Sequence, residues 1–225
     1  KVKNSELMID KLIKDLESLK NPLKAKVLQG FFKTGKWEYW EWDIFLGITV
    51  PIQRQVAGKY TDLDFSQIQK LLDSNIHEYR FSALVILTLK YKKGDFNLKK
   101  EIFEFYLSNT KNINNWDLVD LTCPLLVGNY LQDKDRKVLY DLANSSDLWK
   151  KRIAIISTFD FIKNRDFSDA LKISEILVND KHDLIQKAVW WMLREIWKRD
   201  KQKEIDFLDK FYKIMPRTML RYAIE

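Results

Sequence analysis

Apolar residues recur every three or four positions along most of this chain, which is the spacing of one buried face of a helix. The first such run begins after Ser5, a good helix cap, and is ended by Asn21 and Pro22. No segment alternates between apolar and polar residues with a period of two, so we expect an all-α protein. The other expected helices cover residues 23–32, 51–59, 65–74, 77–92, 98–109, 115–130, 133–144, 148–163, 167–178, 184–198 and 202–215.

The expected helices form pairs, and one pattern recurs at a nearly constant distance. When Ala83, Val119, Ala154 and Ala188 are aligned, the spacings are 36, 35 and 34 residues. A period of this length is typical of helical-hairpin solenoids, whose hairpins bury their apolar faces only against neighbouring hairpins. We therefore expect a curved, right-handed α-solenoid with a concave face; the alternative is a bundle of unrelated helices. The aligned stretches are residues 77–87, 113–123, 148–158 and 182–192.

Composition favours one folded helical domain with an anionic partner. The 225 residues are 46% hydrophobic and 32% charged, as in a globular chain, and 6 Gly and 4 Pro leave few turns for strands. We predict a single domain over residues 1–225. The net charge of +7 favours a partner that carries negative charge.

The cysteine content and the hydropathy favour the cytoplasm. A lone cysteine, Cys123, cannot form an internal disulfide, which fits a reducing compartment, and we expect it to be a small buried side chain. No signal peptide and no apolar stretch of about 18 residues is found. The prediction is a cytoplasmic protein without a membrane segment.

The sequence lacks the usual signatures of catalysis. Its two histidines, His77 and His182, stand at equivalent helix starts, where we expect a capping or surface role. Neither has the spacing of a metal site, and a Ser-His-Asp or Cys-His arrangement would need one of them. Glycine-rich phosphate and dinucleotide motifs are also missing. We therefore expect neither a metal nor an organic cofactor.

Cationic and aromatic residues gather instead at matching positions of the repeats. Trp116 and Asp120 are four residues apart, so they share a face of one helix. If the repeats stack in register, such positions line one surface, which suits phosphates and stacked bases. Asp120 is anomalous there, because a carboxylate repels phosphate. The other candidates are Lys150, Lys151, Arg152, Lys187, Trp190, Trp191, Arg194, Lys198 and Arg199.

Each of these features also has a simpler interpretation. A tryptophan on a repeat helix is more often part of the core than a ligand contact, and lysine runs are often solvated faces. An ion pair with Arg152 would explain why the acidic Asp120 lies on a basic surface. From residue chemistry alone, the chain is a helical-repeat protein with a surface that suits nucleic acid.

Six stretches resemble the DNA alkylation repair family of HEAT-like-repeat DNA glycosylases, the AlkD-like enzymes. They occur in the family's order and span about the whole chain, so the resemblance implies HEAT-like hairpin repeats with a concave basic groove. They read FFKTGKxEYxExDIFLGITVP (31–51), HEYRFSAL (77–84), NNWDLVD (114–120), LWKKRIAI (148–155), LIQKAVxWMLREIWK (184–198) and MPRTMLRYAIE (215–225), where x marks a departure.

The resemblance implies a DNA glycosylase that hydrolyses the N-glycosidic bond of cationic N3- or N7-alkylated purines in duplex DNA. We expect it to act as a monomer, because the groove belongs to one chain, and to be used at the nucleoid. By motif, Trp116 and Trp191 would flank the deoxyribose of the lesion, and Asp120 would lie near its anomeric carbon. Arg152 would bind a nearby phosphate. The alternative is a non-catalytic helical-repeat scaffold that binds DNA or protein. Further DNA-binding candidates are Arg194, Lys187 and Lys151, the last standing where the family has arginine.

Four tryptophans depart from the family pattern in the same way. Where the family carries glycine, this chain has Trp37, Trp40, Trp42 and Trp190. One hypothesis is a difference in decoding, since UGA specifies Trp in some genetic codes and Gly in others; four UGG codons would contradict it. Because Trp does not tolerate positive φ as Gly does, the first three would force a different loop backbone if the family loop uses such angles. Trp190 would add a large side chain beside Trp191 and crowd the lesion site. For the loop with the first three tryptophans, a base-stacking role is the alternative.

Overall fold

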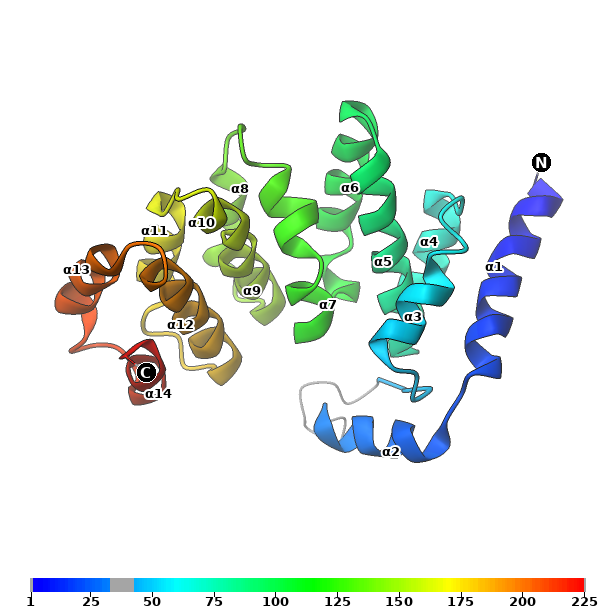
Figure 1. Ribbon diagram of the computed structural model, residues 1–225, viewed down its shortest axis with the longest axis horizontal. Helices are drawn as coiled ribbons and strands as arrows, with labels where there is room; N and C mark the ends of the chain where they lie inside the picture. Colours follow the sequence, from blue (N-terminus) through cyan, green and yellow to red (C-terminus); the bar gives the residue numbers. More distant parts are fainter. Residues whose placement is uncertain (1, 33–42, 225) are drawn as a thin grey trace. The chain divides into compact units, whose positions relative to one another are not determined.

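The computed structural model describes residues 2–32 and 43–224 (Figure 1). Within these ranges every regular element is a helix, and the extended contacts are limited to one isolated bridge between Ile44 and Ile76. The all-α class that the periodicity predicts is therefore confirmed. The chain divides into two compact units, Lys1–Leu118 and Val119–Glu225, which are described in turn.

Helix α5 (His77–Lys93) forms the centre of the first unit. Its residues from His77 to Leu87 are all buried, and α3, α4 and α6 pack against it. A helix enclosed on every side must pair any charge that it carries. The other elements are α1 (Val2–Ser18), α2 (Pro22–Phe31), α3 (Val50–Ala57), α4 (Phe65–Leu72), α6 (Phe96–Ser108) and the short 3-10 turn η1 (Thr110–Asn112).

A buried glutamate holds the segment that leads into α3. The carboxylate of Glu78 accepts backbone N–H bonds from Leu46 at 2.9 Å, Gly47 at 2.8 Å and Ile48 at 3.3 Å. Gly47 has a φ of +85°, and a Cβ atom there would lie 2.2 Å from the carbonyl oxygen of Asn21. This position therefore requires glycine, and the carboxylate of Glu78 is occupied with the backbone.

Helix α12 (Asp183–Trp197) forms the centre of the second unit, with α9, α11, α13 and α14 packed against it. Helix α9 (Leu148–Ser157) also packs against α8 and the π-helical turn η2. A Cβ atom at Gly128 would lie 2.1 Å from the carbonyl oxygen of Ser157, so the close approach of η2 to α9 requires glycine. The other elements are η2 (Pro124–Asn129), α8 (Lys137–Ala143), α10 (Phe159–Lys163), α11 (Ser168–Leu177), α13 (Lys201–Phe211) and α14 (Arg217–Ile224).

The helix predicted over residues 115–130 is broken in the structure. Helix α7 (Trp116–Asp120) is short, a turn follows, and η2 begins at Pro124. Proline has no N–H, and its ring clashes with the carbonyl four residues earlier, here that of Asp120. The proline thus ends the α-helix at Asp120, and π-helical turns are frequent at functional sites. The helix predicted over 148–163 is also divided, at Thr158, and α14 lies outside the predicted helices.

Other sequence predictions have different outcomes. Cys123 is fully buried, as predicted. Among the described residues, no helix is long and apolar enough to cross a membrane. The structure divides into two compact units. The predictions of a single domain over residues 1–225, of a solenoid and of a concave groove stay predictions.

Candidate functional site

Asp120 and Arg152 form a two-point ion pair in the second unit. The Nε atom of Arg152 donates to Oδ1 of Asp120 at 2.8 Å, and Nη2 donates to Oδ2 at 2.7 Å. Two parallel hydrogen bonds are the strongest arrangement between a guanidinium and a carboxylate. The ion pair that offers a simple explanation of Asp120 is therefore present in the structure.

The same guanidinium also reaches α12. Nη1 of Arg152 donates to the carbonyl oxygen of Leu184, in the first turn of that helix, at 2.5 Å. The side chain of Arg152 is 6% exposed and that of Asp120 is 12% exposed, so the ion pair is largely enclosed. Arg152 thus joins the end of α7 to α9 and α12. The phosphate contact predicted for Arg152 stays a prediction.

The buried thiol of Cys123 lies near this ion pair. Burial raises the pKa of Cys123 well above its ordinary value, and the hydrogen bond with Ser157 opposes this only in part. A thiolate, and not a thiol, is the nucleophile in cysteine chemistry. Cys123 is therefore a packing residue beside Asp120.

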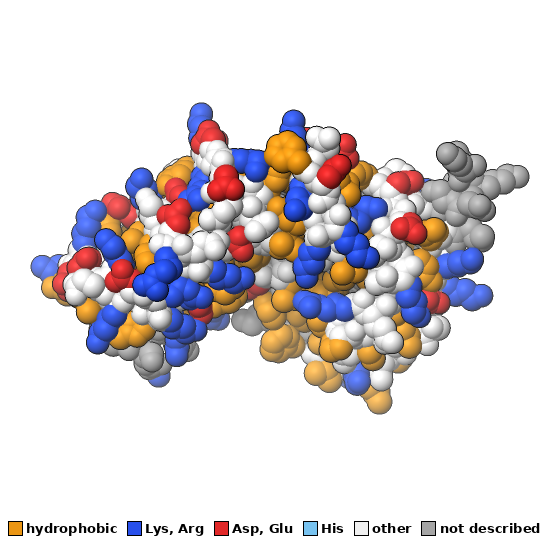
Figure 2. Space-filling model, turned by 45° about the horizontal axis from the view of Figure 1, so that its top comes forward, with side chains coloured by type: hydrophobic (Ala, Val, Ile, Leu, Met, Phe, Trp, Pro, Cys, Tyr) orange, Lys and Arg blue, Asp and Glu red, His pale blue; other side chains and the backbone are white. Residues whose placement is uncertain are grey.

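Two of the predicted DNA-binding lysines form ion pairs of different burial. Lys151 Nζ lies 2.7 Å from Asp180, with the lysine side chain 25% exposed. Lys187 Nζ lies 3.1 Å from Asp183 one turn earlier in α12, and its side chain is 51% exposed. Exposed pairs of this kind contribute about 0–1 kcal/mol, so Lys187 can exchange its partner at little cost. Figure 2 shows Lys and Arg side chains interspersed with Asp and Glu over one face of the molecule.

The adjacent tryptophans of α12 have different packing partners. The ring centre of Trp191 lies 5.8 Å from that of Phe159, in α10, with the planes at 36°. The guanidinium carbon of Arg194 lies 5.7 Å from the ring centre of Trp190. Both tryptophans are partly exposed. Because neighbouring residues of a helix point about 100° apart, each ring has its own surroundings.

In the first unit, Trp116 stands at the end of an aromatic stack. Its ring centre lies 5.4 Å from that of Phe32 with the planes at 20°, and Phe32 lies 5.0 Å from Phe45 at 17°. Phe31, which is 66% exposed, contributes a ring edge 6.3 Å from Trp116. Trp116 is partly exposed. It is therefore packed on one face while remaining accessible to solvent.

A buried charged cluster lies against this stack. The ring of His77 stacks on Phe45 at 4.6 Å, its Nε2 lies 2.8 Å from Oδ2 of Asp117, and its Nδ1 lies 3.4 Å from Oδ2 of Asp43. The same oxygen of Asp43 lies 2.6 Å from Nη2 of Arg80. All four charged side chains are buried. The cluster therefore joins α5, α7 and the segment that begins at Asp43.

The pKa shifts in this cluster follow from its opposite charges. Burial alone would lower the pKa of His77, but the charge of Asp117 and hydrogen bonds with Asp117 and Asp43 raise it to about 9. Burial alone would raise the pKa of Asp43, but the hydrogen bond with His77 and the charge of Arg80 bring it below its ordinary value. His77 is consequently cationic at neutral pH.

The capping or surface role predicted for His77 is wrong, whereas the one for His182 is confirmed. His77 is 3% exposed, and Ile76 precedes it as the cap of α5. The ring of His182 caps α12 by accepting the N–H of Leu184 at 3.2 Å. The missed signal was His77, Glu78 and Arg80 directly before the apolar run of residues 81–87, because charges at the start of a buried segment require buried partners.

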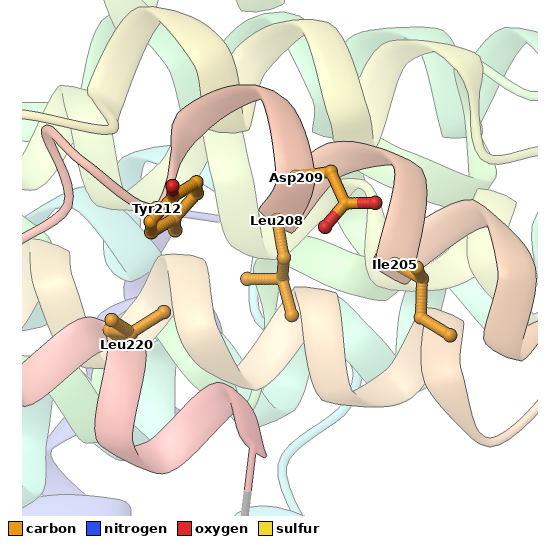
Figure 3. A pocket seen from close by; sticks show the side chains of 5 residues that line it. All are labelled: Ile205, Leu208, Asp209, Tyr212 and Leu220. Atoms are coloured by element: carbon orange, nitrogen blue, oxygen red, sulfur yellow. The ribbon is translucent and has the colours of Figure 1, made fainter.

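A surface pocket lies apart from these residues, between α13 and α14 (Figure 3). Asp209 and the hydroxyl of Tyr212 are the polar groups of its largely apolar lining. Its other lining residues are Ile205, Leu208 and Leu220. Among the described residues, no group of three His, Cys, Asp or Glu side chains has the geometry to hold a metal ion.

The structure brings several, but not all, of the predicted site residues together. Asp120 and Arg152 are in direct contact, and Arg152 contacts the helix that carries Lys187, Trp191 and Arg194. Trp116 belongs to the first unit, whereas Asp120, Arg152 and Trp191 belong to the second. Three of the four tryptophans that depart from the family pattern, Trp37, Trp40 and Trp42, lie outside the described residues.

Comparison with known proteins gives a matching family model and matching solved structures. A family model described as DNA alkylation repair enzyme matches residues 12–225. A solved structure from Enterococcus faecalis, described as a predicted DNA alkylation repair enzyme, has a TM-score of 0.70 at 15% sequence identity, covering 92% of this chain and 95% of that chain. At this identity, the likeness shows a shared fold. No curated protein matches the sequence.

Proposed function

Because the chain belongs to the DNA alkylation repair enzyme family, we propose that it is a DNA glycosylase for cationic N3- and N7-alkylated purines in duplex DNA. Membership of the family supports a role in the repair of alkylated DNA. The finer proposal concerns the reaction, which is hydrolysis of the bond between the alkylated base and its deoxyribose. It rests on the chemistry of the substrate and on the surroundings of Asp120.

The substrate explains why so little catalytic machinery is needed. Alkylation at N3 or N7 makes the purine cationic, so its bond to the sugar is already weakened and the base leaves as a neutral molecule. A strong general acid is then unnecessary. As the bond breaks, positive charge develops on the sugar, and a carboxylate held beside it stabilises that charge, more strongly where bulk water is excluded.

The two-point ion pair between Asp120 and Arg152 is the observation that carries this proposal. A carboxylate stabilises a transition state best when its position is set before the reaction, because no reorganisation is then needed. Arg152 provides this by donating to both oxygens of Asp120. The side chain of Asp120 is 12% exposed, so it is not wholly enclosed. Asp120 would face the sugar cation and orient the attacking water.

The aromatic and cationic residues have supporting roles in this proposal. Trp116 and Trp191 would each contact the alkylated nucleotide, and an aromatic face near a cation contributes about 0.5–2 kcal/mol. Lys187, whose side chain is more exposed than that of Lys151, would bind a phosphate of the backbone. Arg194 and Lys151 would do so more weakly, because the guanidinium of Arg194 lies beside Trp190 and the ion pair of Lys151 with Asp180 is shorter and less exposed than that of Lys187.

One observation favours the alternative of a DNA-binding scaffold without catalysis. Both oxygens of Asp120 already accept hydrogen bonds from Arg152, as in a purely structural ion pair. In that case the family's reaction would be lost while binding to the duplex persisted.

A single assay separates the two functions. The protein is incubated with duplex DNA containing 7-methylguanine, and both the free purine and the retained protein–DNA complex are measured. Release of 7-methylguanine, with none from unmethylated duplex, is expected for the glycosylase. Retention without release would contradict the proposal in favour of the scaffold. If neither occurs, both functions are wrong.

A further inference from the structure

The ring nitrogens of His77 both face carboxylates, and this geometry constrains the protonation of the ring. Nε2 faces Asp117 at 2.8 Å and Nδ1 faces Asp43 at 3.4 Å. An ionised carboxylate only accepts hydrogen bonds, and a neutral imidazole has just one N–H to donate. The neutral ring would therefore direct a lone pair at one of the two carboxylates. The arrangement requires the doubly protonated, cationic ring.

The balance of buried charge leads to the same conclusion. Asp43 and Asp117 carry two negative charges, and Arg80 supplies one positive charge to Asp43. Glu78 is directed elsewhere, because its carboxylate accepts the N–H groups of Leu46, Gly47 and Ile48. Only a cationic His77 makes the cluster neutral. Loss of its proton would leave a net negative charge among buried side chains, which is costly.

His77 is linked to Trp116 by two separate contacts. The first runs through α7, where Asp117 is the residue after Trp116 and its other oxygen accepts the N–H of Leu118 at 2.8 Å. The second runs through Phe32, whose ring centre lies 5.4 Å from the ring centres of both His77 and Trp116. The backbone and the ring plane of Trp116 are thus both in contact with groups that touch His77.

We propose that the cationic form of His77 is a positioning residue that holds Asp117 and Phe32, and through them sets the orientation of the Trp116 indole ring. The inference rests on the proposed function only for the reason why that orientation matters. In the glycosylase, a fixed indole face would meet the alkylated nucleotide without the cost of ordering it during binding.

The charge of His77 makes the inference testable by pH. The pKa of His77 is raised to about 9, so its contribution is fully present below the ordinary histidine value and is lost as pH rises through about 9. The pKa of His182, the other histidine, is lowered by burial. The two titrations are therefore well separated in the intact protein.

The test follows Trp116 by fluorine NMR in protein labelled with 5-fluorotryptophan. The Trp116 resonance is assigned as the one missing from Trp116→Phe, and the two histidines are titrated by proton NMR in the same samples. We expect the Trp116 resonance to be constant between pH 6 and 8 and then to move with the same midpoint as His77, near pH 9. A Trp116 resonance that ignores the His77 titration overturns the proposal.

Three variants sharpen this result. Asp117→Asn removes the charge that acts most on His77, so the common midpoint should fall by about 1–3 pH units. His77→Gln should abolish this movement of the Trp116 resonance, whereas the matched control His182→Gln should leave it in place. Movement that persists in His77→Gln overturns the proposal. The wild-type titration decides the question even if a variant fails to fold.

A catalytic measurement relates the inference to the proposed function. Release of 7-methylguanine under single-turnover conditions is compared between Asp117→Asn and wild type from pH 6 to 8. The rate constant of Asp117→Asn divided by that of wild type should fall as pH rises, because His77 loses its proton in this range only in the variant. A ratio that is constant with pH contradicts a positioning role and indicates ordinary destabilisation. If the wild type releases no base, the proposed function fails, and the NMR titration still decides the role of His77.

Discussion

Arg152 holds Asp120 through two parallel hydrogen bonds and holds the first turn of α12 through a third, to the carbonyl oxygen of Leu184. The carboxylate that the family resemblance assigns to catalysis is therefore positioned by the arginine that the same resemblance assigns to phosphate. These two assignments compete for the N–H groups of one guanidinium. Variants of Asp120 and Arg152 distinguish the charge of the carboxylate from its positioning by the guanidinium.

Replacing Asp120 by asparagine should abolish most excision while leaving DNA binding nearly intact. Asparagine keeps the size of the side chain but removes the charge that would stabilise the developing sugar cation. We expect release of 7-methylguanine to slow by about 100-fold or more. Single-turnover release and a gel-shift titration measure the two effects. Asp141→Asn, at an exposed position of α8, is the matched control; an Asp120→Asn variant as fast as wild type would remove Asp120 from its role.

Replacing Arg152 by alanine should cost stability because it leaves the carboxylate of Asp120 without its partner. Breaking a buried ion pair in this way destabilises a protein by about 3–5 kcal/mol. Urea unfolding of Arg152→Ala, Asp120→Asn and the double variant measures the coupling between the two side chains. The double variant should lose clearly less free energy of unfolding than the two single variants lose together. If the loss of unfolding free energy in the double variant equals the sum of the two single losses, the ion pair contributes little to the stability of the fold.

Replacing Lys187 by glutamine should weaken binding to every duplex sequence alike. A phosphate contact releases counterions, so its loss should reduce the slope of log affinity against log salt by about 1. Binding is measured by fluorescence anisotropy at several salt concentrations. Lys210→Gln is the control, because Lys210 is similarly exposed and pairs with Glu175. Equal slopes for Lys187→Gln and wild type would exclude this contact.

Replacing Glu204 by glutamine should stabilise the protein increasingly as pH rises. Glu204 is fully buried, and within the described residues neither of its carboxylate oxygens has a hydrogen-bond partner. Burial raises the pKa of Glu204 to about 7, while the charge of Arg194 opposes this rise. The unfolded chain releases the proton at lower pH than the folded one, so wild-type stability falls between about pH 4.5 and 7.

The free energy of unfolding of Glu204→Gln should therefore increasingly exceed that of wild type as pH rises through this range, and the difference should reach about 1–3 kcal/mol at pH 8. Urea midpoints at pH 5, 6, 7 and 8 measure it. Asp209→Asn, at an exposed position of the same helix, should show no such trend. A gain that is independent of pH would show that Glu204 does not titrate in this range.

Element positions follow from the sequence wherever local signals agree. Short polar side chains cap helices in both units, and Asn21, Asp64, Asp95, Asp147 and Asp200 each accept a backbone N–H of the first turn. These caps explain why most observed starts lie close to the predicted ones. The break after Asp120 was harder to see, because the apolar period continues through Pro124 and only the backbone chemistry of proline interrupts it.

The all-α class, most helix positions, the family and the identity of the residues proposed for chemistry follow from the amino-acid sequence, because periodicity, caps and motifs are properties of neighbouring residues. Which charged side chains meet depends on the packing of the helices. The partners Asp120 and Arg152 are 32 residues apart, and His77 and Asp117 are 40 apart. Such pairs depend on how helices pack, and burial then sets their strength and their pKa values, so a local pattern can mark His77 as buried but cannot name its partners.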